Sequence, residues 1–564
     1  MKFNSSQYVN YEEMVQVLEA FAAQHPNLVQ LSTIGTSAQQ RKIWKVAVSD
    51  HSKRLSEDKP TFLIDANMHA SEVSGTQVCL YSIQKIINDF ESNSVLQDLL
   101  EKITIVFIPR VCPDAAESYL KNHFEIRSSL YEWPSSDLPH QFVAEDMDGD
   151  GVIRLMRVQD PSGTFRCSKK NPEIMVQRTH DDYDPKEIYY NLYPEGRFKT
   201  KMSDTGAVRK QNFSSQFGLD LNRQFPAEFR PEGQQKGAGP YPGFVPESKS
   251  MIEFVSRSKR LFGHLNLHTY GGLILREPSC LPDEKIPESD VLILNRLAER
   301  AAEVSGYIKV NTYKDFRYTD RDVATGTLSD WAYLHRGLFS SVVEIWDVWK
   351  AAGLQVKDHV SRYFNPTEDD LVKIFAWAKK TLPNNSFYSR WKKYKHPDFG
   401  QVEIGGWSKE RVFRNPPEKF LKSECEKVYQ IIFSQIKTAP MVMLKKKSVK
   451  KLNGNQYLIT AHFQNVGFLP TNGSEQAVRV EAVQLPQLQL QLQKSQKLVG
   501  GEYHQEVSHL KGRSRMLPWH TPLGFVTRPN NHESQMQWTI QGKGEVTISA
   551  DFQRGGLLKL KIKI

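Results

Sequence analysis

The chain has 564 residues, which is too long for one ordinary core. Its residues are 39% hydrophobic and 11% aromatic, which is too apolar for a largely disordered protein. No stretch approaches the roughly 20 consecutive apolar residues of a membrane-spanning helix, which argues against a membrane protein. The formal net charge is +10, and part of the excess comes from a lysine run at 445–451. Because no recognition motif accompanies this run, we expect a solvated face and no nucleic-acid partner.

The N-terminus and the cysteines bear on the cellular compartment. Residues 1–14 contain no apolar stretch of the kind that a secretory signal needs. The five cysteines are scattered and include no CxxC pair, so they do not indicate a disulfide framework. Both observations favour the cytoplasm, whereas the sequence does not determine the oligomeric state.

The first two thirds of the chain alternate between predicted helices and strands. Apolar residues at helical spacing predict a helix over 11–22, and two strands follow at 28–35 and 42–49. The same patterns predict buried strands and helices further along, the strands at 61–65, 103–109, 264–268 and 341–346 and the helices at 73–88, 246–257, 287–305 and 367–381. This alternation predicts an α/β fold with a mixed, mostly parallel sheet and helices on both faces.

Three other segments differ from this alternation. Residues from about 125 to 205 show little periodicity and read as a long surface insertion within an α/β unit that spans 1–383. Residues 384–440 read as a linker with a helical stretch near 418–437. From 441 to 564 the apolar residues alternate with period two, which predicts a small C-terminal antiparallel β-sandwich.

Polar residues with metal-binding chemistry fall at the ends of predicted strands. His69 and Glu72 lie three residues apart just after the strand at 61–65, and His268 ends the strand at 264–268. Glu344 lies inside another apolar strand, where a charged residue needs a partner or a function. Ligands of open α/β sheets bind at the carboxyl ends of the strands, and a His₂Glu set leaves one zinc position open. Each residue alone is more often structural, and it is their combination that indicates a zinc site.

Several motifs in chain order resemble those of the M14 zinc carboxypeptidases. The similarity covers roughly residues 8–382 and is carried by the sequences NMHASE, IPRVCPDAAE, LDLNRQFP, LNLHTYGG and GTLSDWAYLHRGLFSSVVEIWD. In the family, the first and fourth motifs supply metal ligands and the last one ends in the catalytic glutamate. The combination is far more specific than any single motif.

The resemblance implies a role for each matching residue. One zinc ion per chain would be held by His69, Glu72 and His268, and Glu344 would take a proton from the zinc-bound water and pass it to the leaving amine. The substrate's terminal carboxylate would bind Asn222 and Arg223. Asp220 would orient a zinc-bound imidazole, and Arg209 is the candidate for the arginine that stabilises the oxyanion.

The sequence departs from the family pattern at three places. The residue between His69 and Glu72, often Arg in the family, is Ser71. Ungapped counting puts Asp322 where the family has a substrate-capping Tyr, and Tyr318 four residues upstream is the candidate replacement. Ser329 occupies the position that helps to set the side-chain preference. Because it is neither acidic nor bulky, a preference for basic C-terminal residues is not supported and the preferred residue stays open.

A calcium-loop pattern lies inside the insertion. Asp146, Asp148 and Asp150 are followed by Gly151, as in the first half of an EF-hand loop. The twelfth position is Arg157 and not Glu, which argues against a full EF-hand. Two alternatives remain, a bound calcium ion and an Asp/Gly-rich turn without metal, and the turn is slightly favoured.

These patterns predict a zinc-dependent hydrolase that removes C-terminal residues from peptides with a free terminal carboxylate. A second interpretation keeps the site and makes the protein a zinc amidase that acts on cell-wall peptides or small acyl-amino acids. A third interpretation is an inactive, peptidase-like binding protein. Because all three candidate ligands and Glu344 are present, the third is the least favoured.

Overall fold

The computed structural model describes residues 3–122, 126–133, 142–198, 217–317, 323–355, 360, 365–383, 386–408, 411–514 and 531–564. The chain begins with helix α1 (Tyr11–Gln24), whose first turn is closed by a capping box between Asn10 and Glu13. The hairpin β1 (Val29–Thr36) and β2 (Lys42–Val48) follows. No helix in the described part of the chain is both long enough and apolar enough to cross a membrane.

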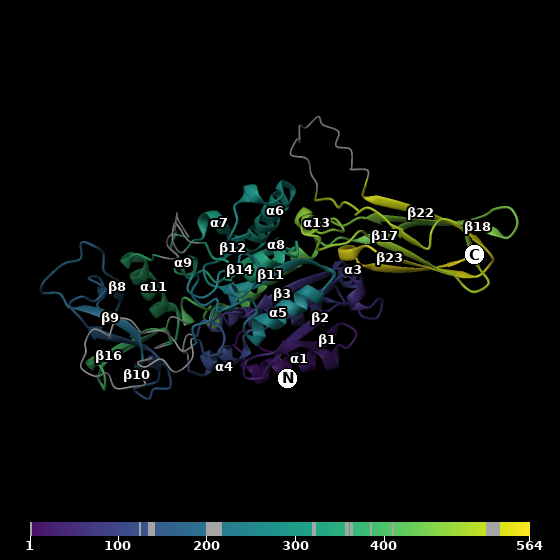
Figure 1. The fold of residues 1–564 in the computed structure, drawn as a ribbon. Coiled ribbons are helices and arrows are strands. Elements are labelled where there is room, and N and C mark those ends of the chain that lie inside the picture. The colour runs from purple at the N-terminus through teal and green to yellow at the C-terminus, as the bar shows by residue number, and fades with distance from the viewer. Residues whose placement is uncertain are drawn as a thin grey trace.

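An eight-stranded mixed sheet forms the centre of the molecule, in the order β1-β2-β4-β3-β11-β14-β12-β13 (Figure 1). Its other strands are β3 (Thr61–Ala66), β4 (Thr104–Ile108), β11 (Leu261–Thr269), β12 (Leu273–Arg276), β13 (Ile308–Asn311) and β14 (Phe339–Ile345). Four neighbouring pairs are parallel: β3 with β4, β3 with β11, β11 with β14, and β12 with β13. Every residue of β4, β11 and β14 is buried, which explains why these strands read as continuous apolar runs.

Helices flank the sheet, as the alternation of elements predicts. They are α2 (Ser74–Asp89), α3 (Ser94–Lys102), α4 (Pro113–Asn122), α5 (Pro246–Arg257), α6 (Glu288–Ser305), α7 (Thr312–Asp315), α8 (Leu328–Leu334), α9 (Val348–Ala351), α11 (Glu368–Thr381) and α12 (Glu418–Ile436). Helix α12 packs against both α2 and α6, and these two contact the central strands, so the three helices form one layer. The predicted α/β fold class is therefore confirmed.

The insertion contains regular structure that its sequence does not reveal. Short strands β6 (Leu155–Gln159), β7 (Phe165–Cys167), β8 (Met175–Gln177) and β9 (Tyr189–Pro194) join β15 (Tyr388–His396) and β16 (Gly400–Trp407) in one six-stranded sheet, while β5 (Phe142–Ala144) pairs with β10 (Gly196–Phe198). Where the sequence indicates an irregular linker, the structure thus has the hairpin β15–β16. Strand β16 pairs with β6 from more than 200 residues away, and such a partnership leaves no local pattern.

The C-terminal part forms two four-stranded antiparallel sheets, as the period-two pattern predicts. One sheet contains β17 (Val442–Lys451), β18 (Gln456–Asn465), β22 (Glu533–Gln541) and β20 (Lys497–Gly500). The other contains β21 (His504–Glu506), β19 (Gln487–Gln491), β23 (Glu545–Asp551) and β24 (Leu557–Lys563). The two sheets share a core of their own. In Figure 1 this sandwich and the insertion sheet lie at opposite ends of the central α/β unit.

Candidate active site

Two parallel strand ends bring a histidine–glutamate–histidine cluster together. Strand β3 ends at Ala66, and the side chain of Asn67 then donates hydrogen bonds to the carbonyl oxygens of His69 (2.7 Å) and Ala70 (3.1 Å), which shapes the following loop. His268 lies near the end of the neighbouring parallel strand β11. As a result, the ligating atoms of His69, Glu72 and His268 lie within 4.8 Å of one another, and all three residues are buried.

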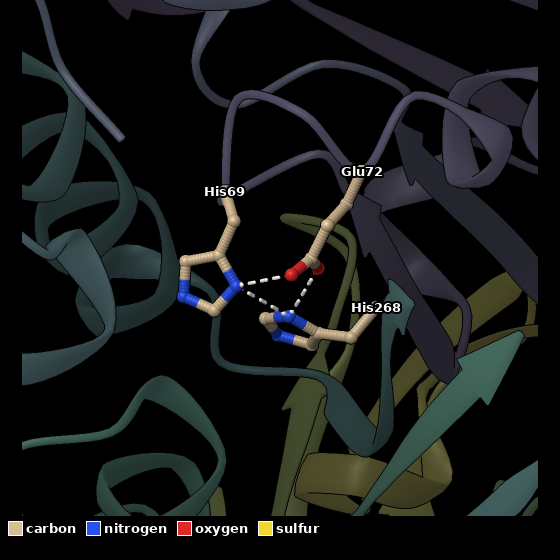
Figure 2. Close-up of side chains that lie close together, drawn as sticks. All are labelled: His69, Glu72 and His268. Carbon is tan, nitrogen blue, oxygen red and sulfur yellow. Dashed lines mark hydrogen bonds and ion pairs between the residues drawn. The ribbon is translucent and has the colours of Figure 1, made fainter. Parts of the chain in front are cut away.

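The geometry of the cluster is close and three-sided (Figure 2). The Nδ1 atoms of His69 and His268 are 3.0 Å apart. The two oxygens of Glu72 each lie 2.9 Å from one of these nitrogens, Oε1 from His69 and Oε2 from His268. Two imidazole nitrogens and a carboxylate thus face a common point.

The contacts of the two Nε2 atoms bear on the tautomer of each imidazole. His69 Nε2 lies 3.2 Å from Oδ1 of Asp220, and His268 Nε2 contacts Oδ1 of Asn266. Both partners can accept a hydrogen bond from Nε2, and in that tautomer each Nδ1 presents a lone pair toward the cluster. Burial also lowers the pKa of His268, which favours its neutral form. Two imidazole nitrogens and a carboxylate therefore converge, an arrangement that a bound cation satisfies and that suits zinc by donor type.

A buried chain of hydrogen bonds holds the imidazole of His268 on the side away from His69 and Glu72. Asn266 donates through Nδ2 to Asp65 (2.6 Å), which fixes the amide so that its oxygen faces His268. The other Asp65 oxygen lies 2.5 Å from Nε2 of His264, whose Nδ1 lies 2.8 Å from the hydroxyl of Ser340. The sequence analysis missed this chain. Its signal is the alternation of His264, Asn266 and His268 in the otherwise apolar strand HLNLH.

Glu344 lies next to the cluster because of strand register. It is opposite His268 in the parallel pair of β11 and β14, and it lines the same cavity as the three candidate ligands. Its Oε2 atom is buried and has no hydrogen-bond partner among the described residues. Burial and the charge of Glu72 raise the pKa of Glu344 well above its ordinary value, against the opposing charges of Arg414 and Arg127. This carboxyl group is therefore poised to hold a proton.

A short helical turn presents the predicted carboxylate-binding pair. Asp220 caps the turn η3 (Leu221–Arg223) by accepting a hydrogen bond from the backbone N–H of Asn222 (2.8 Å). The Oδ1 atom of Asn222 accepts from the N–H of Leu328 (2.9 Å), so its amide is held in one orientation. Both Asn222 and Arg223 line the cavity, where they lie beside the metal-binding cluster.

Two arginines that the sequence analysis did not select reach the cluster. Arg127 Nη1 and Arg414 Nη1 each lie 3.8 Å from Oε1 of Glu72, and both side chains line the cavity. Arg127 also donates through Nε to Asp220 at 2.8 Å. Although burial alone would raise the pKa of Asp220, the charges of Arg127 and Arg223 hold it well below its ordinary value. The predicted residues Arg209 and Tyr318 lie outside the described residues.

The cavity that joins these residues has an empty volume of about 650 Å³, which includes space open to solvent. Ser329, selected from the sequence as a specificity position, lines it. The wall also includes the apolar residues Leu275, Phe316 and Val342 and the acidic residue Glu277.

The acidic loop of the insertion is separate from this site. Carboxylate oxygens of Asp146, Asp148 and Asp150 lie within 4.8 Å of one another. Each accepts a backbone N–H from within the loop, and Asp150 also pairs with Arg154 at 2.7 Å. These bonds describe an Asp/Gly-rich turn, and calcium binding there stays a prediction from the sequence.

The fold and the cluster define a mixed α/β protein with a buried His/Glu/His site at the carboxyl edge of its sheet. More than half of the chain, residues 14–138 and 188–374, matches the family model described as zinc carboxypeptidase. The chain belongs to this zinc carboxypeptidase family, peptidase family M14. Residues 441–563 match a model described as a domain of unknown function, DUF8731. The gap at 139–187 corresponds to much of the insertion sheet, and Arg414 lies beyond the matched residues.

Individual relatives match over shorter lengths. A zinc carboxypeptidase of Saccharothrix mutabilis subsp. capreolus is 36% identical over 110 residues, which cover 20% of this chain and 25% of that protein. Carboxypeptidase D of Homo sapiens is 21% identical over 246 residues, which cover 41% of this chain and 17% of that protein. The chain therefore spans a quarter or less of the length of these curated relatives.

Two solved structures match this chain over part of its length. Thrombin activatable fibrinolysis inhibitor is 16% identical with a TM-score of 0.39, and the match covers 67% of this chain and 76% of that one. Carboxypeptidase A from Helicoverpa armigera is 17% identical with a TM-score of 0.38, and the match covers 67% of this chain and 74% of that one.

Proposed function

We propose that this protein is a zinc metallocarboxypeptidase that hydrolyses the last peptide bond of a substrate with a free C-terminal carboxylate. One observation carries the proposal: a single cavity contains the His69–Glu72–His268 cluster, the unpartnered carboxyl oxygen of Glu344 and the Asn222–Arg223 pair. Membership of the zinc carboxypeptidase family supports the same reaction class.

His69, Glu72 and His268 would hold the zinc ion, since they offer two imidazole nitrogens and a carboxylate within 4.8 Å. When bound, zinc supplies Lewis acidity and makes water a stronger nucleophile near neutral pH. Glu344 accepts a proton from the attacking water and passes it to the nitrogen of the leaving amino acid. Its buried position suits a group that must hold a proton between the two steps, because bulk water has little access to it.

The substrate's orientation follows from the charges along the cavity. Arg223 and the amide of Asn222 bind the terminal carboxylate, for which a planar guanidinium provides two parallel donors. Arg127, held by Asp220 at 2.8 Å, stabilises the negative charge that develops on the scissile carbonyl oxygen. It takes the role that the sequence analysis gave to Arg209.

The test measures zinc content and the hydrolysis of peptides with varied C-termini for the wild type, Glu344→Gln and the exposed control Glu299→Gln. We expect stoichiometric zinc in all three proteins and stepwise C-terminal trimming that only Glu344→Gln loses. Removal of the metal with a chelator should abolish trimming, and added zinc should restore it. Zinc binding without trimming of any peptide would contradict the proposal and favour the amidase interpretation with acyl-amino acids as substrates.

A further inference from the structure

The wall of the cavity contains a buried carboxyl group whose chemistry the proposed reaction does not use. Glu277 lines the cavity, and it is only 2% exposed. Its Oε2 atom is buried without a hydrogen-bond partner among the described residues. An unpartnered carboxyl oxygen in such a place is costly, so it indicates a group that arrives with the ligand.

The surroundings of Glu277 contain more carboxyl groups than cationic side chains. The neighbouring Asp330 carboxylate accepts hydrogen bonds from the backbone N–H (2.7 Å) and the hydroxyl (2.6 Å) of Ser279. The adjacent guanidinium of Arg276 is engaged by Asp283, with contacts of 2.7 and 2.8 Å to its two oxygens. Three carboxyl groups thus accompany one arginine, and that arginine already has its own partner.

This excess has a direct effect on Glu277. Burial, the charge of Asp330 and a hydrogen bond with the Asp330 carboxyl group raise the pKa of Glu277 well above the ordinary value, against a hydrogen bond from the hydroxyl of Ser329 and the charge of Arg276. A cation entering the cavity would remove these causes of the shift, because it compensates the lost hydration and separates the two carboxylates.

The wall that leads to Glu277 is apolar. Leu273 is opposite Glu344 in the antiparallel pair of β12 and β14, and Leu275 is opposite Val342 two residues further along. Leu275, Val342 and Phe316 line the cavity, and Glu277 follows directly after the end of β12. Along β12, starting from the end beside Glu344, the lining of the cavity is therefore first polar, then apolar and finally acidic.

We infer that Glu277 forms the end of the pocket for the substrate's C-terminal side chain and binds a cationic group on an aliphatic stem, as in lysine or arginine. The inference rests on the proposed function for the position of that side chain. Lysine and arginine bury their methylene groups against apolar walls and place their charge at a polar end, which matches the order of surfaces here. An acidic side chain would meet two carboxyl groups and is rejected.

Ser329 fits this assignment through its small size. The sequence analysis judged a basic preference unsupported because Ser329 is not acidic. In the structure, the acidic group comes from Glu277 on the neighbouring chain segment, and the small Ser329 contacts it by its hydroxyl. The charge that selects the substrate therefore comes from a different residue.

The test compares kcat/KM of the zinc-loaded, full-length protein for peptides that differ only in a C-terminal Lys, Arg, Gln, Leu or Glu. We expect Lys and Arg to be preferred over Leu and Glu to be the poorest. The isosteric change Glu277→Gln should lower the Lys-to-Leu ratio by about 100-fold, because it removes one partner of a buried charge pair. Glu284→Gln, an exposed change in the same segment, should leave the ratio as it is, and zinc content and Tm report whether each variant folds.

Each outcome has a separate meaning. A wild type that prefers Leu, or a Glu277→Gln variant with an unchanged ratio, would overturn the inference while leaving the carboxypeptidase activity intact. A preference for Gln retained by Glu277→Gln would show a neutral hydrogen-bonding pocket instead. If the protein trims no peptide, the proposed function fails. In that case, calorimetry can still test the inference by measuring how the same peptides bind to zinc-loaded Glu344→Gln. Tighter binding of the Lys peptide than of the Leu peptide supports the inference, and equal binding of the two peptides overturns it.

Discussion

At the scale of single residues, the site contains one arginine inside the region that matches the family model and one arginine outside it. Arg127 belongs to the matched residues, whereas Arg414 follows them, yet both approach Oε1 of Glu72 to 3.8 Å. The family's frequent arginine between His69 and Glu72 is Ser71 in this chain. A guanidinium from a distant segment thus lies beside the cluster where the local one is missing.

Truncation of these two arginines should affect catalysis to different degrees. Arg127→Ala should lower kcat/KM by about 10²–10³-fold, the usual cost of losing a donor to a developing oxyanion. For Arg414→Ala we expect a smaller loss of about 10-fold or more, since this arginine adds positive charge to the same cavity. Steady-state kinetics against the exposed control Arg411→Ala would check both values. Unchanged kinetics in Arg414→Ala would limit that residue to a structural role.

The hydrogen-bond chain below His268 gives a second prediction. In Asp65→Asn, the new amide can present N–H groups to Asn266, whose own amide then turns its NH₂ toward His268. This would force His268 to move its proton to Nδ1, the atom that faces the other candidate ligands. Zinc affinity should fall by about 10–100-fold. Competition with a fluorescent chelator measures the change, and an affinity equal to that of the wild type would show that Asp65 does not set the tautomer.

At the scale of elements, the segment between β16 and α12 holds in place the loop that contains His69 and Glu72. Asn415 donates through Nδ2 to the carbonyl of Ser71 (2.7 Å) and accepts through Oδ1 from the N–H of Ser74 (3.1 Å), at the start of α2. Its neighbour Pro416 accepts a hydrogen bond from the hydroxyl of Tyr8 (2.6 Å). The loop with His69 and Glu72 is therefore clamped by residues more than 300 positions away.

Removal of this clamp should loosen the site without touching a candidate ligand. Asn415→Ala leaves a buried N–H and a buried carbonyl unsatisfied, which costs about 1–3 kcal/mol for each group. We expect a lower Tm and a reduced kcat/KM with zinc still bound. Calorimetry and kinetics on Asn415→Ala and the exposed control Asn453→Ala would test this. A variant with normal stability would show that the loop holds its shape unaided.

At the scale of the whole molecule, the C-terminal sandwich is docked on the α/β unit through buried polar contacts. Arg554 donates to the carbonyl oxygens of Gly337 (2.6 Å) and Arg336. The N–H groups of Glu475 and Gln476 donate to the two oxygens of Asp290, at 3.0 and 2.9 Å. Burial lowers the pKa of Arg554 to about 9, which shows how far this guanidinium is removed from water.

Loss of Arg554 should therefore destabilise the contact between the two parts. Arg554→Ala should lower the free energy of unfolding by about 3 kcal/mol or more, because it leaves buried carbonyl groups without their donor. We expect cleavage near residue 440 in limited proteolysis at temperatures that the wild type resists. Trimming activity per folded molecule should change little, since none of the sandwich residues that the structure describes lines the cavity. Proteolysis at the wild-type rate would mean that other contacts suffice.

The sequence by itself determined the α/β fold class, the C-terminal sandwich and the His69–Glu72–His268 cluster as a candidate site. These features are local in the chain: periodicity of two or 3.6 residues, a three-residue spacing, and polar side chains in apolar strands. Glu344 was selected as a charged residue in an apolar strand, and Asn222 and Arg223 were selected through the resemblance of LDLNRQFP to a motif of the family.

Only the tertiary structure decided which arginines and which buried acid line the cavity, and which strands form the insertion sheet. Arg414 reaches the cavity because a distant segment packs beside it, and Glu277 reaches it because it follows the end of a strand. Neither position leaves a periodic pattern or a characteristic spacing in the sequence. The insertion sheet depends likewise on pairing with β16 across more than 200 residues. Contacts of this length are fixed by packing and register, which are properties of the folded chain and not of any stretch within it.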